Sequence, residues 1–318
     1  GNPVQIAHPM GLNTAMTYDI WGNLLTARQY GSHNGYTVDH AQSWYYDARQ
    51  RLCRHSVPES GDTLYAYDNA NQTTGIARGQ SAGTACSTLP AASRVTQVWD
   101  NRGRLDQVLY PDASPDVDYG YDANGNMTSA VRGTTSWAYQ YNALDAITQE
   151  TLTVDGLTFT TGYTRNADGY VTHQTTPAGR SVSYLPDGFG RATRVRVGST
   201  NYAASASYHP SGGLAALSYG NGRALSMTYN TRQLVTDMTV SGGGTLLDFD
   251  YGYNANAHVT SIDDNVVAGQ DRSFTYDDLN RLLTASGPWG SGSFVYDPLG
   301  NIRRQTLGSR VVEVDPAP

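Results

Sequence analysis

The stretch that decides the fold is "SFVYDPLGNIRRQTLG", residues 293–308. Two short runs rich in apolar and β-branched residues flank a tetrad that begins at Asp297 and ends at Gly300. Such runs favour strands. A short acceptor such as Asp starts a tight turn, and Gly closes one at low steric cost. The stretch therefore predicts a strand, a tight turn and a second strand.

The same pattern recurs along the chain, for example as "YDIWGNLLT", residues 18–26, and "YDANGNMTSA", residues 121–130. The residue before each turn is here called the anchor. The thirteen copies have the anchors Tyr18, Tyr46, Tyr67, Trp99, Tyr121, Tyr141, Arg165, Pro186, Tyr208, Tyr229, Tyr253, Tyr276 and Tyr296. From Trp99 onward the anchors are 20 to 24 residues apart, and two earlier steps of 28 and 32 indicate insertions. A fixed period of this length is typical of repeat architectures.

Two positions of the repeat predict its turn. The residue after the anchor is Asp or Asn in twelve copies, with His209 as the exception. The residue four past the anchor is most often Gly, and otherwise Asn or Asp in three copies, as expected where a type I turn closes in the left-handed conformation. The predicted turn residues include Asp19 and Gly22, Asp100 and Gly103, Asp122 and Gly125, Asp187 and Gly190, and Asp297 and Gly300. Gln50, Gln233 and Ala257 break the rule, so we expect their turns to differ in geometry or to carry strain.

Two further positions predict one apolar face. The residue six past the anchor is apolar in twelve copies. A second aromatic residue often stands two residues before the anchor, and this spacing puts both aromatics on one face of a strand. The predicted packing aromatics are Tyr18, Tyr46, Tyr67, Trp99, Tyr121, Tyr141, Tyr208, Tyr229, Tyr253, Tyr276 and Tyr296. We therefore predict an all-β fold, with tandem antiparallel hairpins side by side in a curved sheet. Residues 1–318 would form a single array with its repeats over 16–310 and almost no helix.

Bulk composition argues against nucleic acid as a partner and does not settle whether the two cysteines are bonded. The net charge is −7, and the 21 basic residues, all Arg, form no cluster, so nucleic acid is not an expected partner. No apolar run is long enough to span a membrane, and "GNPVQIAHPMG" at the start lacks the regions of a signal peptide. Cys53 and Cys86 do not fit a redox or zinc motif; they could form a disulfide or remain two thiols.

For each candidate catalytic or metal site, a structural role accounts for the residues better than a functional one. "GQSAG", Gly79–Gly83, matches a serine hydrolase pattern but lacks the helix that this pattern needs. "DANGN", Asp122–Asn126, resembles a calcium loop without its terminal acid. The seven histidines are scattered, and adjacent carboxylates such as those of Asp263 and Asp264 would point to opposite faces of a strand. We therefore expect no enzyme activity, no cofactor and no bound metal.

The string YDxxGN, repeated at about 21 residues over most of the chain, resembles the YD repeat of the Rhs family. That family includes bacterial Rhs and wall-associated polymorphic toxins, the C subunits of Tc toxins and the teneurins. The resemblance implies a spiral sheet that forms part of a hollow shell around a toxin effector domain or other polypeptide cargo. It also implies a secreted or cell-surface bacterial protein of which this chain is a fragment. Family shells have more repeats and self-cleaving aspartates that no residue here matches, so no proteolytic residue is assigned.

The sequence is also compatible with other roles and contacts. Exposed aromatic residues could instead make the chain a surface adhesion or glycan-binding module. An enzyme would need a cleft of non-repeated polar residues, which the sequence does not show. Besides cargo, the partners of each hairpin are the neighbouring repeats, and unpaired strands at the ends of the array would favour self-association.

Overall fold

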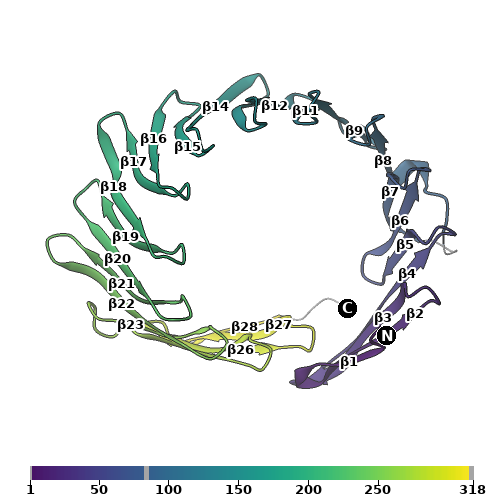
Figure 1. The fold of residues 1–318 in the computed structure, drawn as a ribbon. Helices are drawn as coiled ribbons and strands as arrows, with labels where there is room; N and C mark the ends of the chain where they lie inside the picture. Colours follow the sequence, from purple (N-terminus) through teal and green to yellow (C-terminus); the bar gives the residue numbers. More distant parts are fainter. Residues whose placement is uncertain (1, 82–85, 315–318) are drawn as a thin grey trace. The chain divides into compact units, whose positions relative to one another are not determined.

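The computed structural model describes residues 2–81 and 86–314. They form 28 β-strands of one antiparallel sheet, with two short 3-10 turns, Pro9–Gly11 and Ala91–Ser93, and no α-helix (Figure 1). The all-β hairpin fold predicted from the sequence is confirmed. Among the described residues, no helix is long and apolar enough to cross a membrane.

The chain divides into two compact units, Gly1–Thr160 and Thr161–Pro318, and the boundary lies inside β14. The first unit contains β1 Gln5–Ala7, β2 Leu12–Tyr18, β3 Leu24–His33, β4 Tyr36–Tyr46, β5 Leu52–Val57, β6 Gly61–Tyr67, β7 Thr73–Gln80, β8 Arg94–Trp99, β9 Leu105–Leu109, β10 Val117–Tyr121, β11 Met127–Arg132, β12 Thr135–Tyr141, β13 Ile147–Val154 and the start of β14 Leu157–Arg165. The second contains the rest of β14, then β15 Val171–Thr175, β16 Ser181–Pro186, β17 Ala192–Val197, β18 Thr200–Tyr208, β19 Leu214–Tyr219, β20 Ala224–Tyr229, β21 Val235–Ser241, β22 Thr245–Tyr253, β23 Val259–Asp264, β24 Arg272–Tyr276, β25 Leu282–Gly287, β26 Gly290–Tyr296, β27 Ile302–Leu307 and β28 Arg310–Glu313. That both belong to one uninterrupted repeat array stays a prediction.

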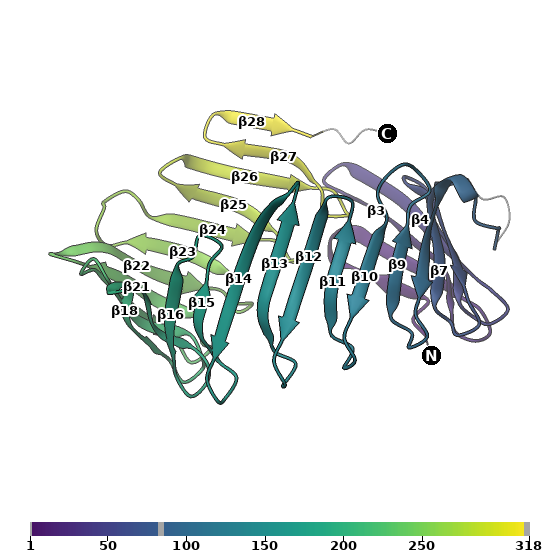
Figure 2. The same ribbon diagram turned by 90° about the horizontal axis from the view of Figure 1, so that it is seen from above.

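The thirteen predicted turns each join an even-numbered strand to the next odd-numbered strand, six in the first unit and seven in the second. Within each unit the hairpins lie side by side, as the teal strands β9 to β13 illustrate in Figure 2. In nearly every hairpin the register shifts at the anchor; in the last, Val295 pairs with Arg304 but Tyr296 pairs with Ile302. This shift is the bulge that a type I turn with a left-handed closing residue produces.

The sheet buries very few side chains. The buried apolar residues of the described chain are Leu12, Cys53, Leu64, Ala77, Leu89, Ala285 and Tyr296. A compact cluster forms where Leu89, from the insertion between β7 and β8, covers Leu64 and Ala77. A single hairpin cannot bury its apolar face by itself, so the stability of each unit depends mainly on contacts between neighbouring hairpins.

Candidate functional site

The repeated turn is built around its Asp side chain. At the last turn, the Asp297 N–H donates to the Asn301 carbonyl at 3.0 Å, and the Gly300 N–H donates back to the Asp297 carbonyl at 3.1 Å. The Asp297 carboxylate accepts the Asn301 N–H at 2.9 Å and the Asn301 Nδ2 amide at 3.0 Å. Arg303 Nε lies 3.0 Å from the same carboxylate, which is fully buried. These bonds close the five-residue turn locally.

The other predicted turn residues occupy the same places. Each turn Asp accepts the N–H of the residue four further on: Asp19 from Asn23 at 2.8 Å, Asp100 from Arg104 at 2.9 Å, Asp122 from Asn126 at 2.9 Å and Asp187 from Arg191 at 3.0 Å. The closing glycines have positive φ: Gly22 88°, Gly103 77°, Gly125 99°, Gly190 81° and Gly300 94°. At His209, the imidazole Nδ1 replaces the carboxylate and contacts Ser211 Oγ at 2.8 Å.

These hydrogen bonds favour the ionised form of the turn carboxylates. The backbone N–H and guanidinium of Arg104 lower the pKa of Asp100. The side chain and N–H of Asn126 lower the pKa of Asp122, and those of Arg191 lower the pKa of Asp187. The hydrogen-bond donors within each of these turns therefore stabilise the negative charge of its own Asp side chain.

The three turns without Gly, Asn or Asp at the closing position have ordinary geometry. Gln50, Gln233 and Ala257 adopt φ of 64°, 65° and 69°, and each donates its N–H to the carbonyl that starts its turn at 2.9 to 3.1 Å. The expectation that these turns differ in geometry is wrong, because the surrounding ladder imposes the same bulge. The alternative expectation, strain, agrees with a left-handed conformation in residues that have a Cβ.

The anchor side chains connect each hairpin to the one before it. Nine anchor tyrosines donate their hydroxyl to the carbonyl of the residue six past the preceding anchor: Tyr46 to Leu24, Tyr67 to Leu52, Tyr121 to Leu105, Tyr141 to Met127, Tyr208 to Ala192, Tyr229 to Leu214, Tyr253 to Val235, Tyr276 to Val259 and Tyr296 to Leu282, at 2.7 to 3.0 Å. Trp99 Nε1 likewise donates to the Thr73 carbonyl at 2.7 Å. Tyr18, in the first hairpin, points its hydroxyl at Met16 Sδ instead. Burial raises the pKa of Tyr46, Tyr141 and Tyr253, so these hydroxyls stay protonated and able to donate.

Sequence reasoning missed the residue five past the anchor. Where it is Arg, the guanidinium binds its own turn Asp and stacks over the next anchor ring at 4.4 to 4.7 Å, as in Arg51 over Tyr67, Arg104 over Tyr121, Arg191 over Tyr208 and Arg281 over Tyr296. Arg281 Nε lies 2.7 Å from Asp277 Oδ2, and its Nη1 donates to the Asp297 carbonyl at 3.1 Å. One side chain thus links two successive turns. The sequence signal for this link was the recurrence of Arg four residues after the turn Asp.

Sequence reasoning also missed two turns at the other ends of the strands, opposite the predicted turns. Gly179 donates its N–H to the Thr176 carbonyl at 2.8 Å, and Gly222 donates to the Tyr219 carbonyl at 3.1 Å, as in the predicted turns. Their sequences, "TPAGR" at 176–180 and "YGNGR" at 219–223, keep the Gly and Arg but lack the initial Asp. The predicted pattern was therefore too strict at its first position.

A disulfide joins Cys53 to Cys86, with Cα atoms 5.3 Å apart. Of the two states that the sequence left open, the structure has the bonded one. The bond ties the insertion after β7 to β5, next to the Leu64 cluster. Closing a loop of 33 residues contributes roughly 3–4 kcal/mol in the chain-entropy account.

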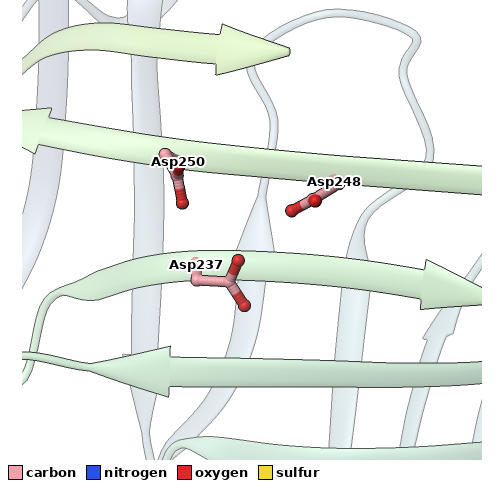
Figure 3. A group of neighbouring side chains, drawn as sticks. All are labelled: Asp237, Asp248 and Asp250. Atoms are coloured by element: carbon pink, nitrogen blue, oxygen red, sulfur yellow. The ribbon is translucent and has the colours of Figure 1, made fainter. Parts of the chain in front are cut away.

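Acidic side chains gather on β21 and β22, where one carboxylate oxygen each from Asp237, Asp248 and Asp250 lies within 4.8 Å of the others (Figure 3). Asp237 and Asp250 are direct cross-strand partners. Thr239 Oγ1 donates to Asp237 at 3.2 Å, and Asn265 Nδ2 donates to Asp250 at 3.0 Å. Such oxygens are the ligand type of hard cations, but nothing beyond the cluster itself points to one.

The other candidate motifs have structural surroundings. Gly79 and Gln80 end strand β7 and Ser81 follows, while the last two residues of "GQSAG" lie outside the described residues. In the loop "DANGN", both carboxylate oxygens of Asp122 accept hydrogen bonds from Asn126. The N–H of Asp264 donates to Asp271, a contact at the end of β23.

The fold and the repeated turn define each unit as a series of YD-type hairpins. The solved structures that this chain resembles include those of Tc toxins. The structure of the Photorhabdus luminescens Tc holotoxin pore with a mutated TccC3 matches 95% of this chain with a TM-score of 0.70 and 14% sequence identity. The TcdB2–TccC3 complex matches 93% with a TM-score of 0.70, and the TcdB2–TccC3–Cdc42 complex matches 92% with a TM-score of 0.69, both at 14% identity.

These comparisons confirm, at the level of the fold, the resemblance predicted from the sequence. The chain spans 19% of the length of each of these Tc toxin chains. No protein-family model matches the chain, and no curated protein matches it.

Proposed function

We propose that this chain is a structural segment of a wall that encloses or displays a polypeptide cargo, such as a toxin effector domain. The observation that carries the proposal is a sheet of equivalent hairpins with few buried side chains. An enzyme usually places unique polar groups in a cleft, whereas the turn carboxylates and anchor hydroxyls here repeat with the hairpins and stabilise them. A wall needs continuous backbone pairing, and these repeats provide it within each unit.

The likeness to Tc toxin structures supports the same role. Two of those structures are complexes of TcdB2 with TccC3, one of them with Cdc42 added. By analogy, we propose that this chain belongs to a longer, secreted or cell-surface bacterial protein and has no catalytic role of its own.

Protease protection tests the proposal in the full-length protein that contains this chain. Under native conditions, trypsin should leave a cargo segment intact that it degrades after mild denaturation. Equal digestion of all segments outside the repeats in both conditions would contradict enclosure.

One observation favours a surface-binding role as the second candidate. Trp137 is 37% exposed, and its ring stacks almost parallel to that of Tyr139 at 6.2 Å. Flat exposed rings suit sugar faces as well as neighbouring proteins. Binding to a glycan array that is lost in Trp137→Ala, with folding intact, would favour this candidate over enclosure.

A further inference from the structure

The series of anchor rings is interrupted in the second unit, where Arg165 and Pro186 replace the aromatic residue. In every hairpin after the first whose anchor is tyrosine, the hydroxyl donates to the carbonyl of the residue six past the preceding anchor. The Tyr208 hydroxyl, for example, donates to the Ala192 carbonyl. At Pro186 the corresponding carbonyl is that of Val171. A proline has no hydroxyl, so the anchor cannot make this bond.

A depression of about 410 Å³ lies at this interruption, and Val171 is part of its wall. The side chains that decide its chemistry are Tyr163, Arg165, Tyr170, Gln174, Tyr184 and Pro186. We call it the Pro186 pocket. All of these residues belong to the second unit.

The geometry of the pocket wall is set by hydrogen bonds and close packing. The Tyr170 ring lies against Gly190, where a Cβ would come within 2.6 Å of the ring. The Tyr184 hydroxyl donates to Gln174 Oε1 at 3.1 Å, so the amide nitrogen is the atom of Gln174 that can donate to a ligand. Arg165 Nη1 donates to the Gly169 carbonyl at 3.1 Å and holds the guanidinium at the pocket.

We propose that the Pro186 pocket receives a tyrosine side chain from a polypeptide that lies on the aromatic face of the sheet. This inference rests on the proposed function, because the polypeptide would be the cargo. The occupant is argued from the fold itself, in which nine repeats place a phenol with its hydroxyl on the equivalent carbonyl.

The size and polarity of the pocket fit this occupant. A cavity of about 150 Å³ can hold one benzene ring, so 410 Å³ accommodates a phenol and part of its backbone. A phenol hydroxyl both donates and accepts. Here the Val171 carbonyl would accept, while Gln174 or Arg165 would donate, and the three tyrosine rings would flank the aromatic body.

Binding of small probes to the intact chain tests the proposal. N-acetyl-L-tyrosinamide, N-acetyl-L-phenylalaninamide and methyl glucoside are compared by NMR titration of the labelled chain. We expect the tyrosine probe to bind roughly three- to tenfold more tightly than the phenylalanine probe, because only it forms the hydroxyl bonds. Equal binding of the two, or preferential binding of the glucoside, would overturn the proposal.

Pro186→Tyr is the decisive variant, since it fills the pocket with the chain's own phenol. It should abolish probe binding and leave thermal stability equal or higher. Gln174→Leu, which keeps the side-chain volume, provides a second test and should weaken binding roughly three- to tenfold. Arg180→Gln removes a charge from an exposed turn at the other end of these strands, outside the pocket lining, and should bind like the unchanged chain.

Unchanged binding in both Pro186→Tyr and Gln174→Leu would refute the pocket assignment. Failure of this test would leave protease protection of the cargo unaffected, so the two proposals can fail separately.

Discussion

The hydroxyl of Tyr296 donates to the backbone carbonyl of Leu282 at 2.8 Å. Backbone pairing between β25 and β26 begins at Thr284 with Ser293, so Leu282 lies beyond the end of that ladder. The tyrosine therefore supplies a hydrogen bond to this carbonyl at a place that the backbone pairing does not reach. The same relation in nine repeats explains why the anchor is tyrosine rather than phenylalanine.

Tyr296→Phe should lower the free energy of unfolding by about 1–2 kcal/mol, because a carbonyl in a partly buried setting loses its partner. Chemical denaturation followed by circular dichroism measures the change. Tyr18→Phe is the matched control, since that hydroxyl contacts a sulfur atom at 3.4 Å in place of a carbonyl. Equal losses in both variants would argue against a role for the hydroxyl.

Arg281→Lys should destabilise the chain by roughly 1–3 kcal/mol, although the charge is kept. An ammonium cannot contact Asp277, the Asp297 carbonyl and the Tyr296 ring at once, as the guanidinium does. The change is measured by urea denaturation against Arg310→Lys, which alters an exposed arginine of β28. If Arg281→Lys were neutral, the link between turns would be only electrostatic.

Ala257→Gly should stabilise the chain by about 1 kcal/mol, since glycine adopts the φ of 69° without the steric cost of a Cβ. Ala255→Gly, in the same turn but without positive φ, should instead be neutral or destabilising. Thermal melts of the two variants give the comparison. A gain in both would indicate that the effect is not conformational.

The chain should lose stability as the pH falls below about 4. Hydrogen bonds lower the pKa of Asp100, Asp122 and Asp187 in the folded chain. Their contribution is therefore complete above the unfolded value of about 3.9 and is lost as the pH falls through the lower folded values.

Asp100→Asn tests the acid sensitivity, because the amide oxygen keeps one acceptor but does not titrate. Urea denaturation at pH 7 and pH 3 should show a smaller difference for Asp100→Asn than for the unchanged chain. An unchanged difference would mean that other carboxylates dominate.

Self-association through the exposed strands β1 and β28 is a further expectation. Among the described strands, β1 and β28 each pair with one neighbour, and all residues of both are exposed. In an antiparallel pair of two β28 strands, Arg310 would face Glu313 and Val311 would face Val312 of the second copy. Val312→Lys should reduce association in sedimentation velocity experiments. A monomer at high concentration without the substitution would contradict this expectation.

Much of the hairpin could be predicted from the sequence because its causes are local. Asp297 and Gly300 lie within one five-residue turn, and the alternation around Tyr296 fixes its face. The link from Arg281 to Tyr296 could not be predicted, since the two are 15 residues apart and meet only when hairpins pack. The Pro186 pocket was missed for the same reason, because a missing ring produces a cavity only between neighbours.

The sequence by itself thus determined the repeat, the turn and the apolar face, since each depends on residues within one hairpin. Only the tertiary structure decided which carbonyl each anchor binds, which of two states Cys53 and Cys86 adopt, and where the anchor series opens into a pocket. The reason is physical: side chains and carbonyls from different hairpins come within hydrogen-bonding distance only after the backbone ladder has fixed their register.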